Sequence, residues 1–217
     1  MIAFRTLIPA VLVLALAGCA TLPPSPKSTT ALTVLGSSAD LHAKARACQE
    51  LGFYGGPEAV PALAALLDKE YLADYARSGL EGIKDAAAGD ALRRALPGLS
   101  GRYLSGVVNS LGVRRDVAAV PALQVLALDS KRGVADEAVA SLGMIATRDA
   151  AQTLQQVLTG GSAELKTAAA HASLVAATTL TQAGQRDAAR ELLAAVIRAT
   201  TVGALRKVAE SQAAALQ

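Results

Sequence analysis

The sequence predicts an almost purely α-helical protein built from repeated pairs of helices. Alanine makes up more than a fifth of the chain, whereas aromatic residues account for only 3% and tryptophan is absent. Alanine and leucine favour helices, while strands need more β-branched and aromatic residues. Two columns of leucines recur with a nearly constant period: Leu51, Leu80, Leu111 and Leu142, and then Leu63, Leu92, Leu123 and Leu154. Because each leucine of the second column follows its partner at the same fixed offset, each repeat holds one helix pair.

A tight turn is expected between the two columns. Five residues after each leucine of the first column stands a residue that suits a helix N-cap: Gly56, Asp85, Asp116 and Thr147. We expect Gly52, Gly112 and Gly143 to end helices, where left-handed backbone is common. Pro61 and Pro121 fall early in a helix and are expected to bend it.

The apolar spacing places each expected helix. The ranges are 39–52, 57–68, 70–81, 86–96, 100–112, 117–128, 133–146, 148–158, 162–183, 186–198 and 201–216. The interval from Leu142 to Leu180 is longer than the preceding intervals of the first column. The extra residues amount to about two helical turns, so the helix over 162–183 is expected to be long.

Two segments resemble HEAT repeats. They are Glu58-Ala59-Val60-Pro61-Ala62-Leu63 with Tyr75-Ala76-Arg77-Ser78-Gly79-Leu80, and Ala119-Val120-Pro121-Ala122-Leu123 with Ala138-Val139-Ala140-Ser141-Leu142-Gly143. The closest type is the short, alanine-rich bacterial one, which also occurs in phycobilisome-lyase-type proteins. The resemblance covers roughly residues 40–183 and implies a right-handed α-solenoid whose second helices line a concave, protein-binding face. Asp90 departs from it by standing where Pro61 and Pro121 stand in other repeats, and the last helix pair is closer in length to a tetratricopeptide (TPR) unit.

The N-terminal segment has the parts of a secretory signal. Arg5 is followed by an apolar stretch and then by Leu16-Ala17-Gly18-Cys19, which resembles the lipobox of bacterial lipoproteins. The resemblance implies a signal peptide over 1–18, two or three acyl chains (palmitate among them) on Cys19, and, with Ala20 next, an outer-membrane location facing the periplasm. An ordinary cleaved signal or an uncleaved anchor helix are the alternatives.

Two regions are expected in the chain after Gly18, a tether and a folded domain. Residues 19–38 are proline- and serine-rich, which predicts a flexible tether that reaches at most about 60 Å. Residues 39–217 are expected to form the HEAT-like repeat domain.

The residues that usually carry chemistry are sparse. The two histidines, His42 and His171, are far apart in the repeat array, and no phosphate loop, CxxC pair or zinc-protease motif occurs. We therefore expect no catalytic residue, cofactor or metal. The formal net charge of +3 and the lack of clustered basic and aromatic residues argue against nucleic acid. Cys48 is interpreted as a small core residue, with a reactive thiol as the alternative.

Two charged residues break the repeat pattern. Arg77 and Glu81 occupy columns that hold apolar residues or glycine elsewhere, and their spacing lets them pair on one helix face. The alternatives are a buried or groove-edge ion pair, a local register shift that lets Gly82 take the glycine role, or part of a binding face. The other candidates for that face are Tyr75, Tyr103, Asn109, Arg114 and Arg115, since exposed tyrosine and arginine commonly anchor interfaces. For Arg114 and Arg115 a solvated turn is the alternative.

The sequence thus favours a non-catalytic scaffold that is anchored to the cell envelope by lipid and binds a partner protein through its solenoid surface. The alternatives are an accessory or lyase-like repeat protein that handles a small molecule or an enzyme, and a purely structural envelope component.

Overall fold

The protein is all-helical, as predicted. The computed structural model describes residues 23–216, and within that range the chain forms α-helices and short 3₁₀ turns but no strand. The α-helices are α1 (Pro26–Gly36), α2 (Leu41–Tyr54), α3 (Val60–Ala64), α4 (Ala73–Gly82), α5 (Ala86–Ala95), α6 (Gly101–Val113), α7 (Val120–Leu128), α8 (Ala135–Ile145), α9 (Arg148–Gly160), α10 (Ala163–Gln182), α11 (Arg186–Ala199) and α12 (Gly203–Ala214). The 3₁₀ turns are η1 (Pro57–Ala59), η2 (Leu96–Gly98), η3 (Val117–Ala119) and η4 (Ser130–Arg132).

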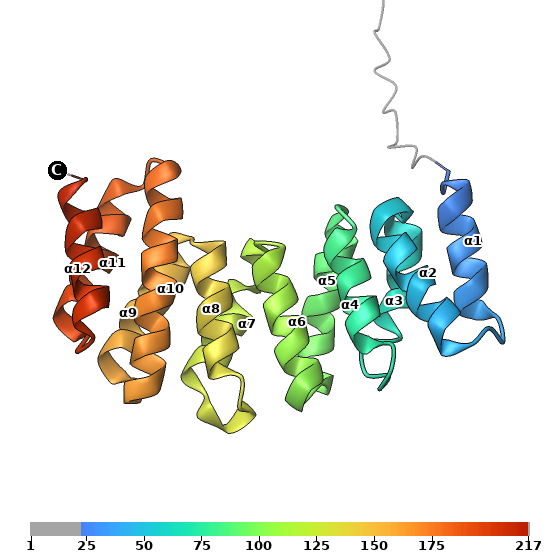
Figure 1. Cartoon of the computed structure of the whole chain (residues 1–217), viewed down its shortest axis with the longest axis horizontal. Coiled ribbons are helices and arrows are strands. Elements are labelled where there is room, and N and C mark those ends of the chain that lie inside the picture. The colour runs from blue at the N-terminus through green and yellow to red at the C-terminus, as the bar shows by residue number, and fades with distance from the viewer. Residues whose placement is uncertain (1–22, 217) are drawn as a thin grey trace, which may run out of the picture.

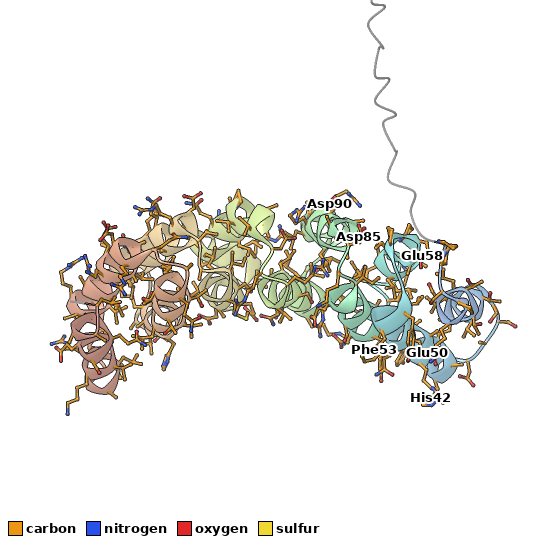
Figure 2. All side chains as sticks on the ribbon, turned by 90° about the horizontal axis from the view of Figure 1, so that it is seen from above. His42, Glu50, Phe53, Glu58, Asp85 and Asp90 are labelled. Carbon is orange, nitrogen blue, oxygen red and sulfur yellow. The ribbon has the colours of Figure 1, made fainter. Side chains whose placement is uncertain are left out.

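The helices pack into a curved stack of two layers. Helices α2, α4, α6, α8 and α10 lie side by side in one layer, while α3, α5, α7, α9 and α11 form the other (Figure 1). His42 and Phe53 of α2 lie on the concave side, whereas Asp85 and Asp90 lie on the convex side (Figure 2). The layer of α2 to α10 therefore forms the concave face, and both leucine columns are buried between the layers.

All four predicted N-cap residues occupy that position. Asp85 accepts a hydrogen bond from the amide of Ala87 at the start of α5, and Thr147 accepts one from Ala150 at the start of α9. Gly56 and Asp116 precede 3₁₀ turns and make no side-chain cap. The carboxylate of Asp116 instead pairs with Arg93 of α5, so this turn is tied to the preceding helix pair.

The expected bend at the two prolines is wrong. Pro61 and Pro121 stand in the first turn of α3 and α7, where a missing N–H leaves no helical hydrogen bond unmade. The residues before them form the 3₁₀ turns η1 and η3. The prolines therefore mark the change from 3₁₀ to α-helix instead of kinking a continuous helix.

Three glycines lie near helix ends as expected, but without the expected left-handed backbone. Gly52, Gly112 and Gly143 lie in the last turn of α2, α6 and α8, where the next helix of the concave layer comes too close for a side chain. A Cβ at Gly143 would lie 2.8 Å from the Cβ of Ala172 in α10, and one at Gly112 would lie 2.8 Å from the Cα of Ser141 in α8. These glycines set the spacing of the concave layer.

The predicted tether is wrong over most of its length. Pro26–Gly36 forms α1, because Ser25 caps the helix by accepting the amide of Ser28 and the proline fits its first turn. Ser28 and Ala31 are buried where α1 packs on α2. The Ser28 hydroxyl donates to the Oε1 atom of Glu58 over 2.7 Å. The folded domain thus begins at Pro26, while Cys19 and the expected signal peptide over 1–18 lie outside the described residues.

The predicted lengthening of the fifth unit is confirmed. Helix α10 has 20 residues, whereas α8 has 11. Ala172 faces Gly143, just as Ser141 faces Gly112, so the repeat register continues into α10. Most of the extra residues therefore lengthen α10 at its C-terminal end. Between Pro23 and Leu216, no helix combines the length and the apolar character that crossing a bilayer would require.

Candidate functional site

Arg77 and Glu81 form the predicted pair on one face of α4. The Nη1 atom of Arg77 lies 2.8 Å from Oε1 of Glu81, and both side chains are about three-quarters buried or more, with 26% and 20% exposed. The Ser110 hydroxyl of α6 donates to the same carboxylate oxygen over 2.6 Å and accepts from Arg77 over 3.2 Å. We call Arg77, Glu81 and Ser110 the polar bridge, because they join α4 to α6.

The polar bridge stands where the following concave helices pack closely against each other through a glycine. Glu81 stands one residue after a leucine of the first column, where Gly112 and Gly143 stand in the following helices. Gly106 of α6 makes room for the bridge, since a Cβ there would lie 3.0 Å from Cδ and Nε of Arg77. The buried Nε atom of Arg77 has no hydrogen-bond partner in the described structure. The ion pair that the spacing predicted is therefore present, and Glu81 also lines a groove.

The groove lies between α2 and α4 on the concave face. It encloses about 500 Å³ and is lined by Gln49, Gly52, Phe53, Ser78, Glu81 and Gly82. Its floor is narrow because a Cβ at Gly52 would lie 3.1 Å from the Cα of Gly79. Phe53 is 83% exposed beside it, and Figure 2 shows this ring on the concave side. We call this site the Phe53 groove; it offers an apolar ring, a carboxylate and two polar side chains to a ligand.

The two tyrosines do not meet. Tyr75 is exposed on α4, about 200° around the helix axis from Arg77. Tyr103 of α6 packs partly against the core, with the guanidinium of Arg102 4.6 Å from its ring centre. Asn109 is half-buried on α6. The structure thus gathers Arg77 and Glu81 but leaves these three candidates outside the Phe53 groove.

Arg114 and Arg115 have different surroundings. The Arg114 guanidinium donates to the carbonyl oxygens of Leu80 and Asp85 over 2.7 and 3.1 Å, and also to those of Glu81 and Ile83. It therefore caps the C-terminal end of α4, whose last carbonyls have no partner within the helix. Arg115 has a left-handed backbone with φ of 50° and an exposed side chain.

Sequence reasoning missed the residues on which the Phe53 groove depends. Gln49 and Phe53 stand one turn apart on α2, and no charge or motif singled them out. Aligning the repeats places Phe53 in the column of Gly82, Val113 and Met144, so an aromatic residue in an otherwise non-aromatic column was the available signal.

The other candidates for chemistry stay apart. His42 and His171 are exposed on α2 and α10, and no cluster of possible metal ligands occurs between residues 23 and 216. Cys48 is fully buried, and burial raises the pKa of its thiol from 9.0 to about 11 despite a backbone hydrogen bond that lowers it. The thiol is accordingly the core residue that the sequence favoured. Comparison with protein-family models and with curated proteins finds no match to this chain.

Proposed function

We propose that this chain is a non-catalytic scaffold, held to the bacterial cell envelope by lipid on Cys19, that binds a partner protein in the Phe53 groove. The observation that carries the proposal is the 83% exposure of Phe53 beside a groove on the concave face. An aromatic ring of this exposure gains free energy when a partner covers it, at about 25 cal/mol per Å² of apolar surface. Aromatic anchors beside a polar rim are typical of protein interfaces.

The charge of the groove favours a partner with a basic residue. Glu81 lines it, and the carboxylate shares its oxygen Oε1 with Arg77 and Ser110. Its other oxygen has no partner among the hydrogen bonds of the described structure. We therefore expect an apolar side chain of the partner against Phe53 and a lysine or arginine near Glu81.

The helical stack also supports a more specific proposal about the fold. The regular repeat period and the two helical layers suit a right-handed, HEAT-like α-solenoid that ends in a TPR-like pair, α11 and α12. Such stacks provide extended concave surfaces, and binding is their usual use. The inferred anchor then sits close to the stack. Cys19 precedes Ser25 by six residues, which reach at most about 20 Å.

In-cell photo-crosslinking tests the proposed groove. A photoreactive phenylalanine replaces Phe53 in one variant and Val125, which is 65% exposed on α7 of the convex layer, in a matched control. We expect one protein to crosslink in high yield at position 53, to be absent at position 125, and to lose yield when Glu81→Gln is added. Equal yields at both positions, or none at position 53, would refute the groove as the binding site.

The accessory alternative predicts a different result. If the Phe53 groove takes a small molecule, a thermal-shift screen finds a ligand whose stabilisation is lost on Phe53→Ala, while position 53 crosslinks to no protein. Mass spectrometry of the N-terminal peptide tests the anchor separately. The proposal requires the mass of two or three acyl chains on Cys19.

A further inference from the structure

One edge of the stack carries a row of unpaired basic side chains. The turns that lead from each concave helix to the next convex helix lie along this edge, where α1 also begins (Figure 1). Arg114 links two of these turns directly by donating to Ile83 and Asp85. Every turn after the first holds an exposed basic residue immediately before an aspartate: Lys84, Arg115, Arg148 and Arg186. We call this side of the molecule the entry edge.

The four basic residues that precede the aspartates are free, whereas three of the four aspartates, which keep their charge, are engaged. None of these four side chains makes an ion pair or a hydrogen bond within the described part of the chain. In contrast, Asp85 caps α5, Asp116 pairs with Arg93, and Asp187 pairs with Arg190 over 2.9 Å. The remaining aspartate, Asp149, lies in the first turn of α9, where the helix dipole offsets its charge.

Several arginines of the opposite edge bind backbone carbonyls. Arg102 donates to the carbonyl of Glu70, Arg132 to those of Leu96 and Leu99, and Arg206 to that of Thr200. Lys69 pairs with Asp68 over 2.9 Å. Other basic residues of that edge, such as Arg94 and Lys131, make no side-chain bond within the described residues, so the attachment of the chain is what distinguishes the entry edge.

The chain outside the described residues ends at the entry edge. Ser25 donates to the carbonyl of Tyr54, and Lys27 lies 4.2 Å from the centre of the Tyr54 ring. Cys19 lies at most about 20 Å from this point. Tyrosine and lysine together suit the headgroup region, because an amphipathic ring and a flexible ammonium both span an apolar–polar boundary. Further along, Val117 of η3 is 60% exposed beside Arg115.

We propose that the entry edge docks on the anionic phospholipid surface of the membrane that holds Cys19, so that the helices stand upright and the concave face opens sideways. This inference rests on the proposed lipid anchor. Basic residues near an anionic surface each gain attraction that falls off within a Debye length, so a short linker is needed to bring the row into range. Six residues keep the near end of the row within about 20 Å of the anchor, a third of the reach of about 60 Å that the sequence predicted.

A single tryptophan tests the docking, because the chain has none of its own. The reporters are Val117→Trp at the entry edge and Leu128→Trp, 53% exposed at the other end of α7, as the matched control. The two positions lie roughly 17 Å apart along the helix axis, more than the depth of an interfacial contact. Each full-length lipidated variant is reconstituted into vesicles of neutral phosphatidylcholine, or of phosphatidylcholine with phosphatidylglycerol, and quenching by brominated acyl chains is measured.

We expect anionic vesicles to shift Val117→Trp emission to shorter wavelength and to quench it, while Leu128→Trp stays as in water. Adding Arg115→Glu reduces the quenching, and Lys131→Glu, an exposed change at the opposite edge, leaves it unchanged. If the protein floats with vesicles but Val117→Trp stays in water, or both reporters are quenched equally, the docking is refuted while the anchor stands. If the protein fails to float with neutral vesicles and Val117→Trp is quenched only by anionic ones, the docking stands and the anchor fails.

Discussion

Replacing Gly143 with alanine tests how the concave layer is spaced. The new Cβ would lie 2.8 Å from both the Cβ and the carbonyl oxygen of Ala172, and 3.0 Å from its Cα. Carbon atoms in contact normally stay about 3.5–4.0 Å apart, so α8 and α10 must separate by several tenths of an ångström. Two of the three contacted atoms are backbone, which cannot turn away as a flexible side chain can.

The two opposing effects of this change can be compared. Overpacking a tight contact costs about 1–3 kcal/mol, and alanine regains up to about 1 kcal/mol of helix propensity over glycine. We therefore expect a net loss of roughly 1–2 kcal/mol in the free energy of unfolding. For a domain of this size that corresponds to a fall in Tm of about 2–8 °C.

Thermal unfolding followed by circular dichroism measures this loss. Gly160→Ala is the matched control, since Gly160 ends α9 and no atom lies within 4 Å of the position that a Cβ would take there. That variant is expected to keep or slightly raise the Tm. Adding Ala172→Gly to Gly143→Ala removes one of the close contacts and should show a favourable coupling between the two sites. If Gly143→Ala is as stable as Gly160→Ala, the spacing argument is wrong.

Three further variants test other parts of the fold. Arg114→Met removes the donors that cap α4 and should cost about 1–3 kcal/mol in chemical denaturation, while Arg115→Met should change stability by less than about 0.5 kcal/mol. Burial alone would raise the pKa of Glu58, but hydrogen bonds from Ser28 and from backbone amides outweigh it and lower that pKa below its ordinary value of 4.5. The stabilisation is thus present above that value and lost as the pH falls through the folded-state pKa. The protection of the α1 amides against hydrogen exchange, taken relative to the unfolded chain at the same pH, should therefore fall under acid and, at neutral pH, in Ser28→Ala; protection that does not change with pH would contradict this. Because the pKa of Cys48 is raised from 9.0 to about 11, its stabilisation is complete below pH 9 and lost towards pH 11. Cys48→Ala should flatten the stability profile in that interval, and an unchanged profile would show that the thiol is not its cause.

The repeat period predicted most of the helical architecture from local rules. The leucine columns and the N-cap residues Gly56, Asp85, Asp116 and Thr147 located the turns, because burial and capping act within one helix pair. The long interval before Leu180 likewise indicated the long α10.

Contacts between units explain what the sequence could not show. Gly143 lies in the last turn of α8, as its local preference predicts, but the sequence could not show that Ala172 of α10 packs closely against it. Pro26 and Ser28 belong to a stretch typical of linkers, yet packing on α2 and the bond to Glu58 stabilise α1. Arg77 and Glu81 were found as a pair, whereas Ser110 and Phe53 joined the site only through the stacking of neighbouring helices.

Hydroxyl-radical footprinting of Phe53 tests the proposed partner site most directly. The complex is extracted in mild detergent and compared with the same protein after its partner has been stripped away. Phe53 and Tyr71 are 83% and 67% exposed, so both rings should oxidise readily in the free protein. The proposed function predicts that the partner protects Phe53 and leaves Tyr71 unchanged. Oxidation of Phe53 at the same rate in both samples would contradict it.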